Sequence, residues 1–367
     1  MRGKLWYSIV LAGIFILLSQ NAFGQFNSTD LEGEWQGYVT AINATTVDIL
    51  DNTITFNENG TFENSADIDN ATLHINSDGI VDGTISINST TLNIPKGKMN
   101  KNKNVIDSAF NTNNSTYGRY DLIKKSSKAG TEDLKGKWII LDYEVLDYNK
   151  TKAIEPSYGI VEFNENGTII NKSQGSFKNS TINVSATGSV NGSLVNDNGT
   201  EITIQSGQIS SNKQFIIQKY TTNSSTFGID YLVKLGDSYS ENDLGAIWHI
   251  TQTENKIDSS IVKSRNATYG AFEIDNDGTV LNEIPYKIFT ISYNNGYIDI
   301  RTGQNIPKGY IKGKLRDGNG TERKIYGGIS SSKEIGVYAY NMTDSPGVAG
   351  FGIGCQPYDV FLLRHSL

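Results

Sequence analysis

The sequence predicts an all-β protein of three tandem antiparallel up-and-down β-barrels, with about eight strands each. Three observations lead to this fold class. A set of sequence markers occurs three times in the same order, and the segments between the markers alternate apolar and polar residues with period two. Asn-Gly and Asp-Gly pairs, which suit tight hairpin turns, separate those segments. No stretch beyond the first 24 residues has a convincing 3.6-residue apolar period, so helices are not expected.

The first 24 residues have the features of a secretory signal peptide. Arg2 and Lys4 precede an apolar run from Leu5 to Leu18, and the small-residue pattern Ala22-Phe23-Gly24 follows. The run is shorter than the about 20 apolar residues that span a membrane, and no later segment is a candidate. We therefore expect cleavage after residue 24, secretion to a periplasmic or extracellular location, and no membrane span after cleavage. An uncleaved N-terminal anchor is the alternative.

Charge and cysteine content exclude several classes of function. The formal net charge is −7 at pH 7, and loss of the signal peptide removes two more positive charges. Nucleic acid and anionic membrane surfaces both reward clustered Lys and Arg, so neither is an expected partner. Cys355 is the single cysteine, so internal disulfides are impossible. Zinc is not expected, because the three histidines lack metal-ligand spacing: His74, His249 and His365. Calcium at acidic turns such as Asp275 to Asp277 is the alternative, but the aligned turns of the other copies are explained by hairpin geometry, so no metal or cofactor is predicted.

Each copy of the predicted unit opens on the pattern Asp-Leu-x-Gly/Ala-x-Trp. The three tryptophans that follow the signal peptide all occupy this position, about one hundred residues apart: Trp35, Trp138 and Trp248. A hairpin stretch comes next, written FNENGT at residues 56–61 and again at 163–168, and IDNDGT at 274–279. Such fixed-period similarity is typical of repeated domains.

Two further markers complete each copy. One is a turn that begins with Gly and ends with Lys, at residues 97–103, 207–213 and 327–333. The other is an apolar pair followed by a cation, at Leu122-Ile123-Lys124, Leu232-Val233-Lys234 and Leu362-Leu363-Arg364. We predict a signal peptide at 1–24 and barrel units at 25–125, 133–235 and 243–367. The polar linkers between them are short, so we expect three domains in a row that almost touch.

Eight short strands that pair with their sequence neighbours can close into a barrel, which leaves no exposed sheet edge. In the second unit, residues 182–187, 201–205 and 215–218 alternate as half-buried antiparallel strands do. A packed meander sandwich is the competing architecture. Large residues expected to point inward, namely Phe163, Phe215 and Tyr220, would fill an eight-stranded interior, which is only just wide enough for side chains.

The Gly-x-Trp opening, with a cation near the end of the last strand, resembles the lipocalin and wider calycin pattern. This resemblance implies that the Trp plugs one end of a barrel beneath a basic side chain. Trp35 and Trp138 match the pattern with Lys124 and Lys234, whereas Trp248 matches with Arg364 but has Ala246 in place of the glycine. The layout also resembles tandem repeats of secreted bacterial proteins of undefined function. Stacking on sugars is the alternative role for these indoles.

The third unit differs from the others in its final hairpin. The distance from the aligned Lys to the aligned Leu is ten residues longer there, which predicts a ten-residue insertion. A Gly-rich phosphate-binding loop would need a helix after it, and none is predicted. We expect a loop that contacts a partner, with Cys355 either buried or available for an intermolecular bond; its candidate residues are Gly347, Gly350, Phe351, Gly352, Gly354 and Cys355.

These features favour a secreted, non-catalytic protein with a binding or structural role at the cell exterior. Its partner would be a small apolar ligand, a glycan or a surface protein. A carrier that holds a small apolar ligand inside one or more barrels is the first alternative. A hydrolase on a β scaffold is the second, although no catalytic constellation is recognisable.

Overall fold

The computed structural model describes the chain from residue 26 to residue 355 with internal gaps. The described ranges are 26–42, 47–65, 67–113, 116–145, 154–174, 177–240, 243, 246–258, 261–274, 279–280, 286–287, 289–291, 297–298, 305–316, 322–341 and 348–355. The predicted signal peptide, Gly347 and Arg364 lie outside these ranges. Within them every regular element is a strand except two short 3₁₀ helices, η1 (Ser28–Asp30) and η2 (Thr131–Leu134). The all-β prediction is therefore confirmed.

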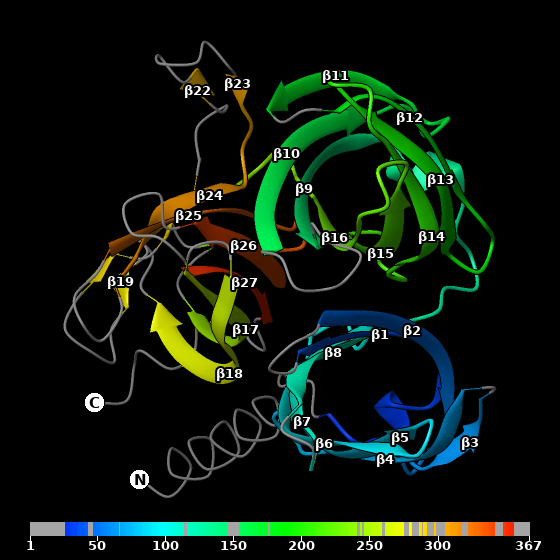
Figure 1. Ribbon diagram of the computed structural model, residues 1–367. Coiled ribbons are helices and arrows are strands. Elements are labelled where there is room, and N and C mark those ends of the chain that lie inside the picture. The colour runs from blue at the N-terminus through cyan, green and yellow to red at the C-terminus, as the bar shows by residue number, and fades with distance from the viewer. Residues whose placement is uncertain are drawn as a thin grey trace, which may run out of the picture.

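The first sheet forms a nearly closed barrel, seen end-on in Figure 1. Its first strand pairs with both the second and the last, and a bridge from Thr61 to Thr72 narrows the remaining seam between β3 and β4. The Leu73 amide donates to the Gly60 carbonyl at 3.0 Å across the same seam. The strands are β1 (Gly33–Ile42), β2 (Val47–Phe56), β3 (Phe62–Asn64), β4 (Ile68–Ile75), β5 (Ile80–Ile87), β6 (Thr90–Met99), β7 (Val105–Asn111) and β8 (Tyr117–Lys124).

The second sheet repeats this order in a second nearly closed barrel. The seam between β11 and β12 is bridged by the Ile182 amide and the Ser180 hydroxyl, which both donate to the Gly167 carbonyl, at 3.2 and 2.8 Å. The strands are β9 (Gly136–Val145), β10 (Ile154–Phe163), β11 (Ile169–Gln174), β12 (Phe177–Val184), β13 (Ser189–Asn196), β14 (Glu201–Ile209), β15 (Phe215–Thr222) and β16 (Phe227–Lys234).

The third sheet has nine strands in the order β20-β19-β18-β17-β27-β26-β25-β24-β21, and β22 pairs with β23 beside it. The described residues thus establish two nearly closed barrels and a third sheet, but not a third full barrel. The strands are β17 (Ala246–Asp258), β18 (Ile261–Ile274), β19 (Thr279–Val280), β20 (Tyr286–Lys287), β21 (Phe289–Ile291), β22 (Tyr297–Ile298), β23 (Asn305–Ile306), β24 (Tyr310–Arg316), β25 (Glu322–Ile329), β26 (Ile335–Asn341) and β27 (Val348–Cys355).

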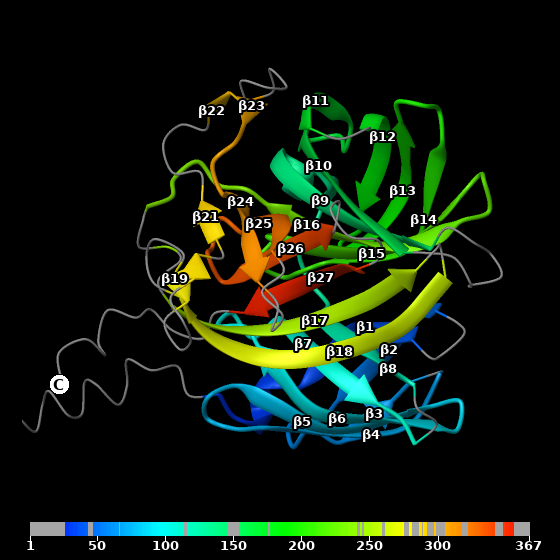
Figure 2. The ribbon, with the colours of Figure 1, turned by 60° about the vertical axis from the view of Figure 1, so that its left-hand side comes forward.

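The three sheets pack around a shared core and do not lie in a row. Six consecutive residues are buried in β8 and six in β16, so these strands are covered on both faces. The long strands β17 and β18 run beside β7 and β8 of the first barrel (Figure 2). The expected linear arrangement was wrong because barrel strands such as β9 and β16 carry apolar residues on their outer faces as well as on their inner faces. The shared core includes Tyr38, Ile123, Ile139, Leu141, Tyr310 and Ile335.

Phe215 belongs to this shared core and not to the barrel interior. Its ring stacks on Tyr231 at a centroid distance of 6.3 Å, with both side chains on the outer face of the second barrel. Phe163 and Tyr220 do lie inside the second barrel, among its buried apolar residues. The alternation was assigned to the wrong face at Phe215, because its neighbour Ile216 is equally apolar and lies inside.

Three turns meet head to tail where the sheets converge. Asn104 Nδ2 donates to the Ser211 hydroxyl at 3.0 Å, and the Ser331 hydroxyl donates to Gln214 Oε1. The ring is completed by Asn100 Nδ2, which donates to Glu334 Oε2 at 3.3 Å. In each turn one lysine adopts the left-handed region, with φ of 56° at Lys103, 61° at Lys213 and 62° at Lys333.

A buried ionic cluster links the first barrel to the second. Arg119 Nη2 donates to Asp107 Oδ1 at 2.8 Å and to Asp121 Oδ1 at 2.9 Å, and all three residues are at most 1% exposed. Tyr231 of the second barrel donates its hydroxyl to Asp121 Oδ2 at 3.0 Å. The guanidinium also lies 5.3 Å from the Tyr231 ring centroid. The cluster therefore fixes how the two outer faces meet.

We expect Arg119→Leu to lower the free energy of unfolding by about 3–5 kcal/mol, because it leaves two carboxylates buried without their cation. Urea denaturation at pH 7 measures this. The matched control is Lys135→Gln, which removes an exposed ion pair with Glu165 and should cost less than about 1 kcal/mol. Equal urea midpoints for Arg119→Leu and the wild-type chain would show that the cluster contributes nothing.

Candidate functional site

One end of each closed barrel is sealed by an indole ring. Trp35 is fully buried, its Nε1 donates to the Leu31 carbonyl at 2.7 Å, and Lys124 Nζ lies 5.4 Å from the ring centroid. The indole and the ammonium group are brought together by strand register, because Trp35 on β1 lies opposite Lys124 on β8. Lys124 Nζ also donates to the Asp30 carbonyl at 3.1 Å. Burial lowers the pKa of Lys124, against the raising effect of Asp30 and Glu32.

The second barrel ends in the same way. Trp138 is fully buried and donates to the Leu134 carbonyl at 2.6 Å, and Lys234 Nζ lies 5.5 Å from its ring centroid. Lys234 Nζ donates to the Asp133 carbonyl at 2.6 Å, and burial lowers the pKa of this lysine. In the third sheet Trp248 is 3% exposed, while its expected partner Arg364 is outside the described residues.

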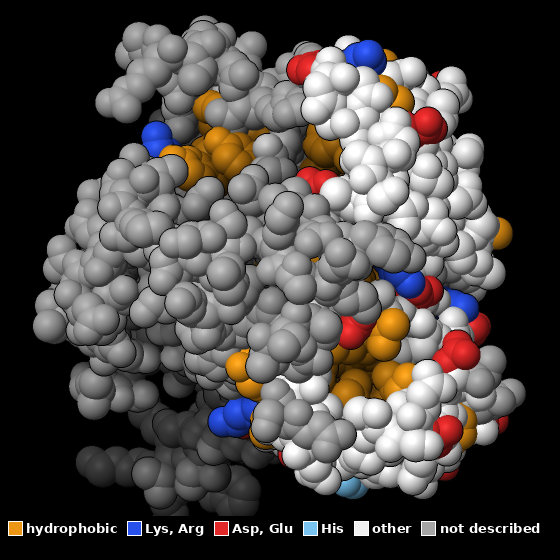
Figure 3. Space-filling view, viewed as in Figure 1, with side chains coloured by type: hydrophobic (Ala, Val, Ile, Leu, Met, Phe, Trp, Pro, Cys, Tyr) orange, Lys and Arg blue, Asp and Glu red, His pale blue; other side chains and the backbone are white. Residues whose placement is uncertain are grey.

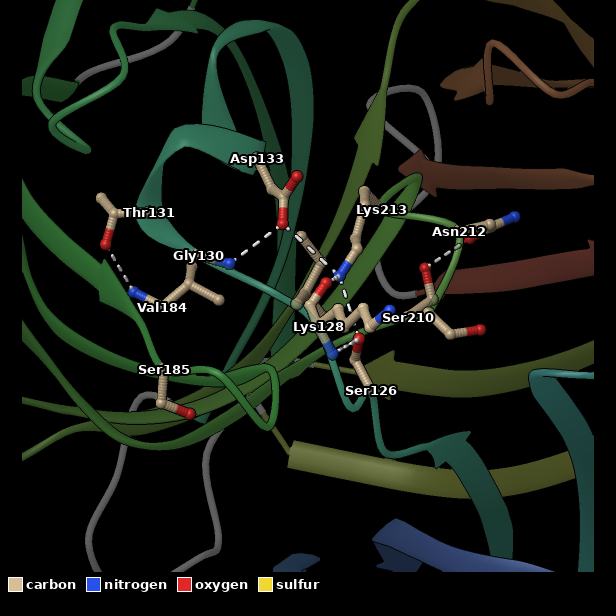
Figure 4. A network of polar contacts seen from close by, with 12 residues as sticks. Ser126, Lys128, Gly130, Thr131, Asp133, Val184, Ser185, Ser210, Asn212 and Lys213 are labelled. Carbon is tan, nitrogen blue, oxygen red and sulfur yellow. Dashed lines mark hydrogen bonds and ion pairs between the residues drawn. The ribbon is translucent and has the colours of Figure 1, made fainter.

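A polar network joins the segment before β9 to the turn that holds Lys213 (Figure 4). Asp133 Oδ2 accepts the Gly130 amide at 3.0 Å and pairs with Lys213 Nζ at 3.4 Å. Lys213 Nζ also donates to the Ser126 hydroxyl at 2.9 Å. The corresponding ion pairs elsewhere join Lys103 to Asp30 at 2.8 Å and Lys333 to Asp243 at 3.0 Å. This end of the barrel is therefore occupied by structural contacts.

The predicted partner loop is a strand as far as the structure describes it. Gly350, Phe351, Gly352, Gly354 and Cys355 all belong to β27, which pairs with β17 on one side and β26 on the other. The glycines at 350, 352 and 354 do not prevent the backbone of β27 from completing both ladders. The loop was inferred from the longer spacing and the Gly-rich sequence, whereas the structure pairs these residues on both sides.

Cys355 lies opposite His249 on β17 and Ile335 on β26. Ile123 and Val233 hold the corresponding register positions in the two barrels, opposite Val105 and Phe215. Burial, and next the positive charges of Lys98 and Lys96, lower the pKa of the half-buried His249 to about 4. A neutral imidazole at neutral pH follows from these surroundings.

The open end of the second barrel contains a cavity of about 210 Å³, away from Trp138. Two inward carboxyls of β9, Asp142 and Glu144, lie on its wall, and Tyr220 donates its hydroxyl to Asp142 at 2.5 Å. Thr226 donates to Glu144, also at 2.5 Å. The wall is completed by Tyr158, Phe177, Asn196, Thr200, Ile202 and Thr222. Sequence reasoning missed this site entirely.

Strand register places a row of polar side chains behind this cavity. Asp142 on β9 is opposite Asp230 on β16, and Asp230 is opposite Gln218 on β15. Gln218 Nε2 donates to Asp230 Oδ2 at 2.7 Å, and both residues are fully buried. Gly228 gives the Tyr220 ring room, since a Cβ there would lie 2.3 Å from the Tyr220 hydroxyl oxygen.

Burial and the neighbouring negative charges raise the pKa values of Asp230 and Tyr220. Burial, and next the negative charge of Asp142, raise the pKa of the Asp230 carboxyl well above its ordinary value. Burial followed by Asp142, Asp230 and Glu144 raises the pKa of Tyr220 in the same direction. Perturbed titratable groups beside a cavity are typical of functional sites. The signal in the sequence was the pair of acids at alternate positions of the otherwise apolar strand IILDYEV.

Among the described residues, no group of three His, Cys, Asp or Glu side chains is arranged to hold a metal ion. The same part of the chain contains no helix that is long and apolar enough to cross a membrane.

No family model matches the sequence, and no curated protein matches it. Similar solved structures include a double mutant of the vaccine antigen transferrin-binding protein B from Haemophilus parasuis Hp5, with 10% identity over 88% of this chain and 75% of that chain and a TM-score of 0.30. The isotype 1 transferrin-binding protein B from serogroup B Neisseria meningitidis has 10% identity over 88% and 76%, with a TM-score of 0.27. A DUF3598-family protein of unknown function from Nostoc punctiforme PCC 73102 has 10% identity over 90% and 99%, with a TM-score of 0.22.

We expect Asp230→Asn to stabilise the protein at neutral pH by about 1–3 kcal/mol, because it removes a buried carboxyl whose ionisation is unfavourable. The pKa of Asp230 is higher in the folded state than in the unfolded state. The contribution of Asp230 to the free energy of unfolding is therefore fully present below the unfolded-state pKa and is lost as pH rises through the folded-state pKa. Stability against urea, measured from pH 4 to pH 8, should fall more steeply for the wild type than for the variant.

Parallel pH profiles for the two chains would contradict the raised pKa of Asp230. Asp82→Asn, at an exposed position of the first barrel, is the control for a general charge effect and should leave the slope of the profile unchanged.

Proposed function

We propose that the chain is a secreted, non-catalytic binding protein built from three copies of one lipocalin-like unit, at residues 25–125, 133–235 and 243–367. The cavity at the open end of the second barrel carries this proposal. Binding sites are typically concave, largely apolar, and equipped with a few convergent polar groups. The cavity is more polar than most binding sites, and it supplies the convergent polar groups in the carboxyls of Asp142 and Glu144 and an apolar part in Phe177 and Ile202.

The equivalence of the three units is supported by the positions of the sequence markers. In both barrels the tryptophan faces the closing lysine in register, and the turn lysine pairs with the aspartate of the opening motif. The Lys333 to Asp243 pair has the same form in the third sheet. Because each unit has its own closed end, the open end of one unit could acquire a binding site without disturbing the fold of the other two.

A binding role is favoured over catalysis by what surrounds the carboxyls. Asp142 and Glu144 accept hydrogen bonds from Tyr220 and Thr226, which holds them in fixed positions. We propose that they orient a ligand and that no bond of the ligand is broken. The partner is taken into the cavity from the cell exterior.

Filling the cavity should abolish binding. We expect Thr222→Tyr to eliminate the ligand-induced thermal shift of the second barrel, because the larger side chain occupies the space beside Tyr220. The matched control is Thr112→Tyr in the first barrel, where the Thr112 amide donates to the Thr116 carbonyl just as that of Thr222 does to Thr226. Thermal shift against panels of amines, sugars and lipids measures the effect. Ligands that bind both variants and the wild type equally would place the site elsewhere.

A carrier of small apolar ligands is the second candidate. One observation favours it: the hollow at one end of the first barrel shows hydrophobic side chains framed by polar ones, in the lower right of Figure 3. An apolar fluorescent probe whose binding is lost in Thr112→Tyr and kept in Thr222→Tyr would support this role for the first barrel.

Export predicts a defined N-terminus. We expect the intact mass of the exported chain to correspond to cleavage after Gly24, which leaves Gln25 first and keeps Phe26, a buried residue of the first barrel core. Mass spectrometry of the chain recovered from the medium or periplasm measures this. Retention of the full mass in the membrane fraction would favour the uncleaved anchor.

A further inference from the structure

The second barrel carries acids where the first barrel carries uncharged residues. The row formed by Asp142, Asp230 and Gln218 has a counterpart in the first barrel at the same register positions. There, Val39 lies opposite Tyr120, and Tyr120 lies opposite Ser108. Because the first barrel closes without any carboxyl in this row, the fold itself does not require the acids of the second.

The acidic row is costly to bury. Asp230 and Gln218 are fully buried, and Gln218 Oε1 accepts no hydrogen bond within the described residues. Each buried acceptor without a donor costs about 1–3 kcal/mol. Tyr120, at the place of Asp230, instead donates its hydroxyl to Asn52 at 2.7 Å and is satisfied. A destabilising arrangement that the related barrel avoids indicates a functional constraint.

The electrostatics of the site favour a positive ligand. Asp142 and Glu144 from β9 and Tyr220 from β15 line the cavity, and Asp230 from β16 lies opposite Asp142. A cation in the cavity would interact favourably with every one of these groups. It would also lower the pKa of Asp230, which the neighbouring negative charges raise, so that binding releases a proton.

The remaining walls indicate an organic cation. Phe177 and Ile202 supply aromatic and apolar surface beside the carboxyls. Calcium prefers six to eight oxygen ligands, whereas an alkylammonium ion uses carboxylates for its N–H groups and apolar or aromatic walls for its carbon atoms. The volume of about 210 Å³ suits a ligand of about five to ten non-hydrogen atoms.

We propose that the cavity of the second barrel binds a small organic ammonium ion, whose N–H groups donate to Asp142 and Glu144 and whose carbon chain packs on Phe177 and Ile202. This inference rests on the proposed binding function of the same cavity and specifies its ligand class. The partner is recognised by its charge and short alkyl chain.

Calorimetric titration of the full secreted chain at pH 7.5 tests the proposal. The probes are butylamine, 1,4-diaminobutane, the neutral analogue butan-1-ol, and calcium chloride. We expect at least one amine to bind at least tenfold more tightly than butan-1-ol, and calcium not to compete. Heats that differ between buffers of different ionisation enthalpy would report the released proton, as expected from Asp230.

The variants Asp142→Asn and Glu144→Gln should each weaken amine binding at least tenfold. Glu165→Gln, an exposed acid of the same barrel, is the matched control and should leave the affinity unchanged. The circular dichroism spectrum and melting temperature of each variant separate loss of binding from loss of folding. Because two independent variants are used, misfolding of one does not remove the test.

Several outcomes would overturn the proposal: no amine binding, equal affinity for butylamine and butan-1-ol, calcium binding in place of amines, or amine binding unaffected by both carboxyl variants. Failure of the ammonium hypothesis and failure of the proposed function remain distinguishable. A neutral ligand whose binding is lost in Thr222→Tyr and retained in Thr112→Tyr would keep the cavity as the binding site and remove only the charge requirement.

Discussion

The arrangement of this protein depends on strands that bury both of their faces. An ordinary antiparallel strand in a small barrel directs one face to the interior and the other to water. Strands β8 and β16 instead have six consecutive buried residues each, so their outer faces must be covered by neighbouring sheets. Burial of apolar surface at about 25 cal/mol per Å² drives this contact. The barrels are consequently parts of one body with a common core.

Directional contacts then determine how the sheets meet. Apolar packing alone tolerates sliding, whereas the contacts of Tyr231 in the second barrel with Asp121 and Arg119 in the first require one relative position. The ring of turns adds three further hydrogen bonds between different sheets, from Asn104, Ser331 and Asn100. Apolar burial provides the stability of the junction, and these polar groups provide its specificity.

The two ends of a barrel have different roles. The indole end is built from the same groups in both barrels: a Trp, a Lys above it and backbone carbonyls that accept from both. The opposite end varies, with Val39 and Tyr120 in the first barrel and Asp142 and Asp230 in the second. The Trp and Lys groups are the same in both barrels because they are needed to close that end. Functional differences can therefore accumulate at the opposite end, where the side chains vary.

Sequence by itself determined what depends on local pattern and spacing. Period-two alternation and Asn-Gly turns were enough for the all-β class. The resemblance of the Gly-x-Trp openings to the lipocalin pattern implied the pairs Trp35 with Lys124 and Trp138 with Lys234, which strand register does bring together. Only the tertiary structure decided that Phe215 lies on the outer face of its barrel and that residues 348–355 pair within a sheet. It also decided that Asp142 lies opposite Asp230. These outcomes depend on contacts between residues far apart in the chain. Period-two patterns define two faces of a strand but not what packs against each one.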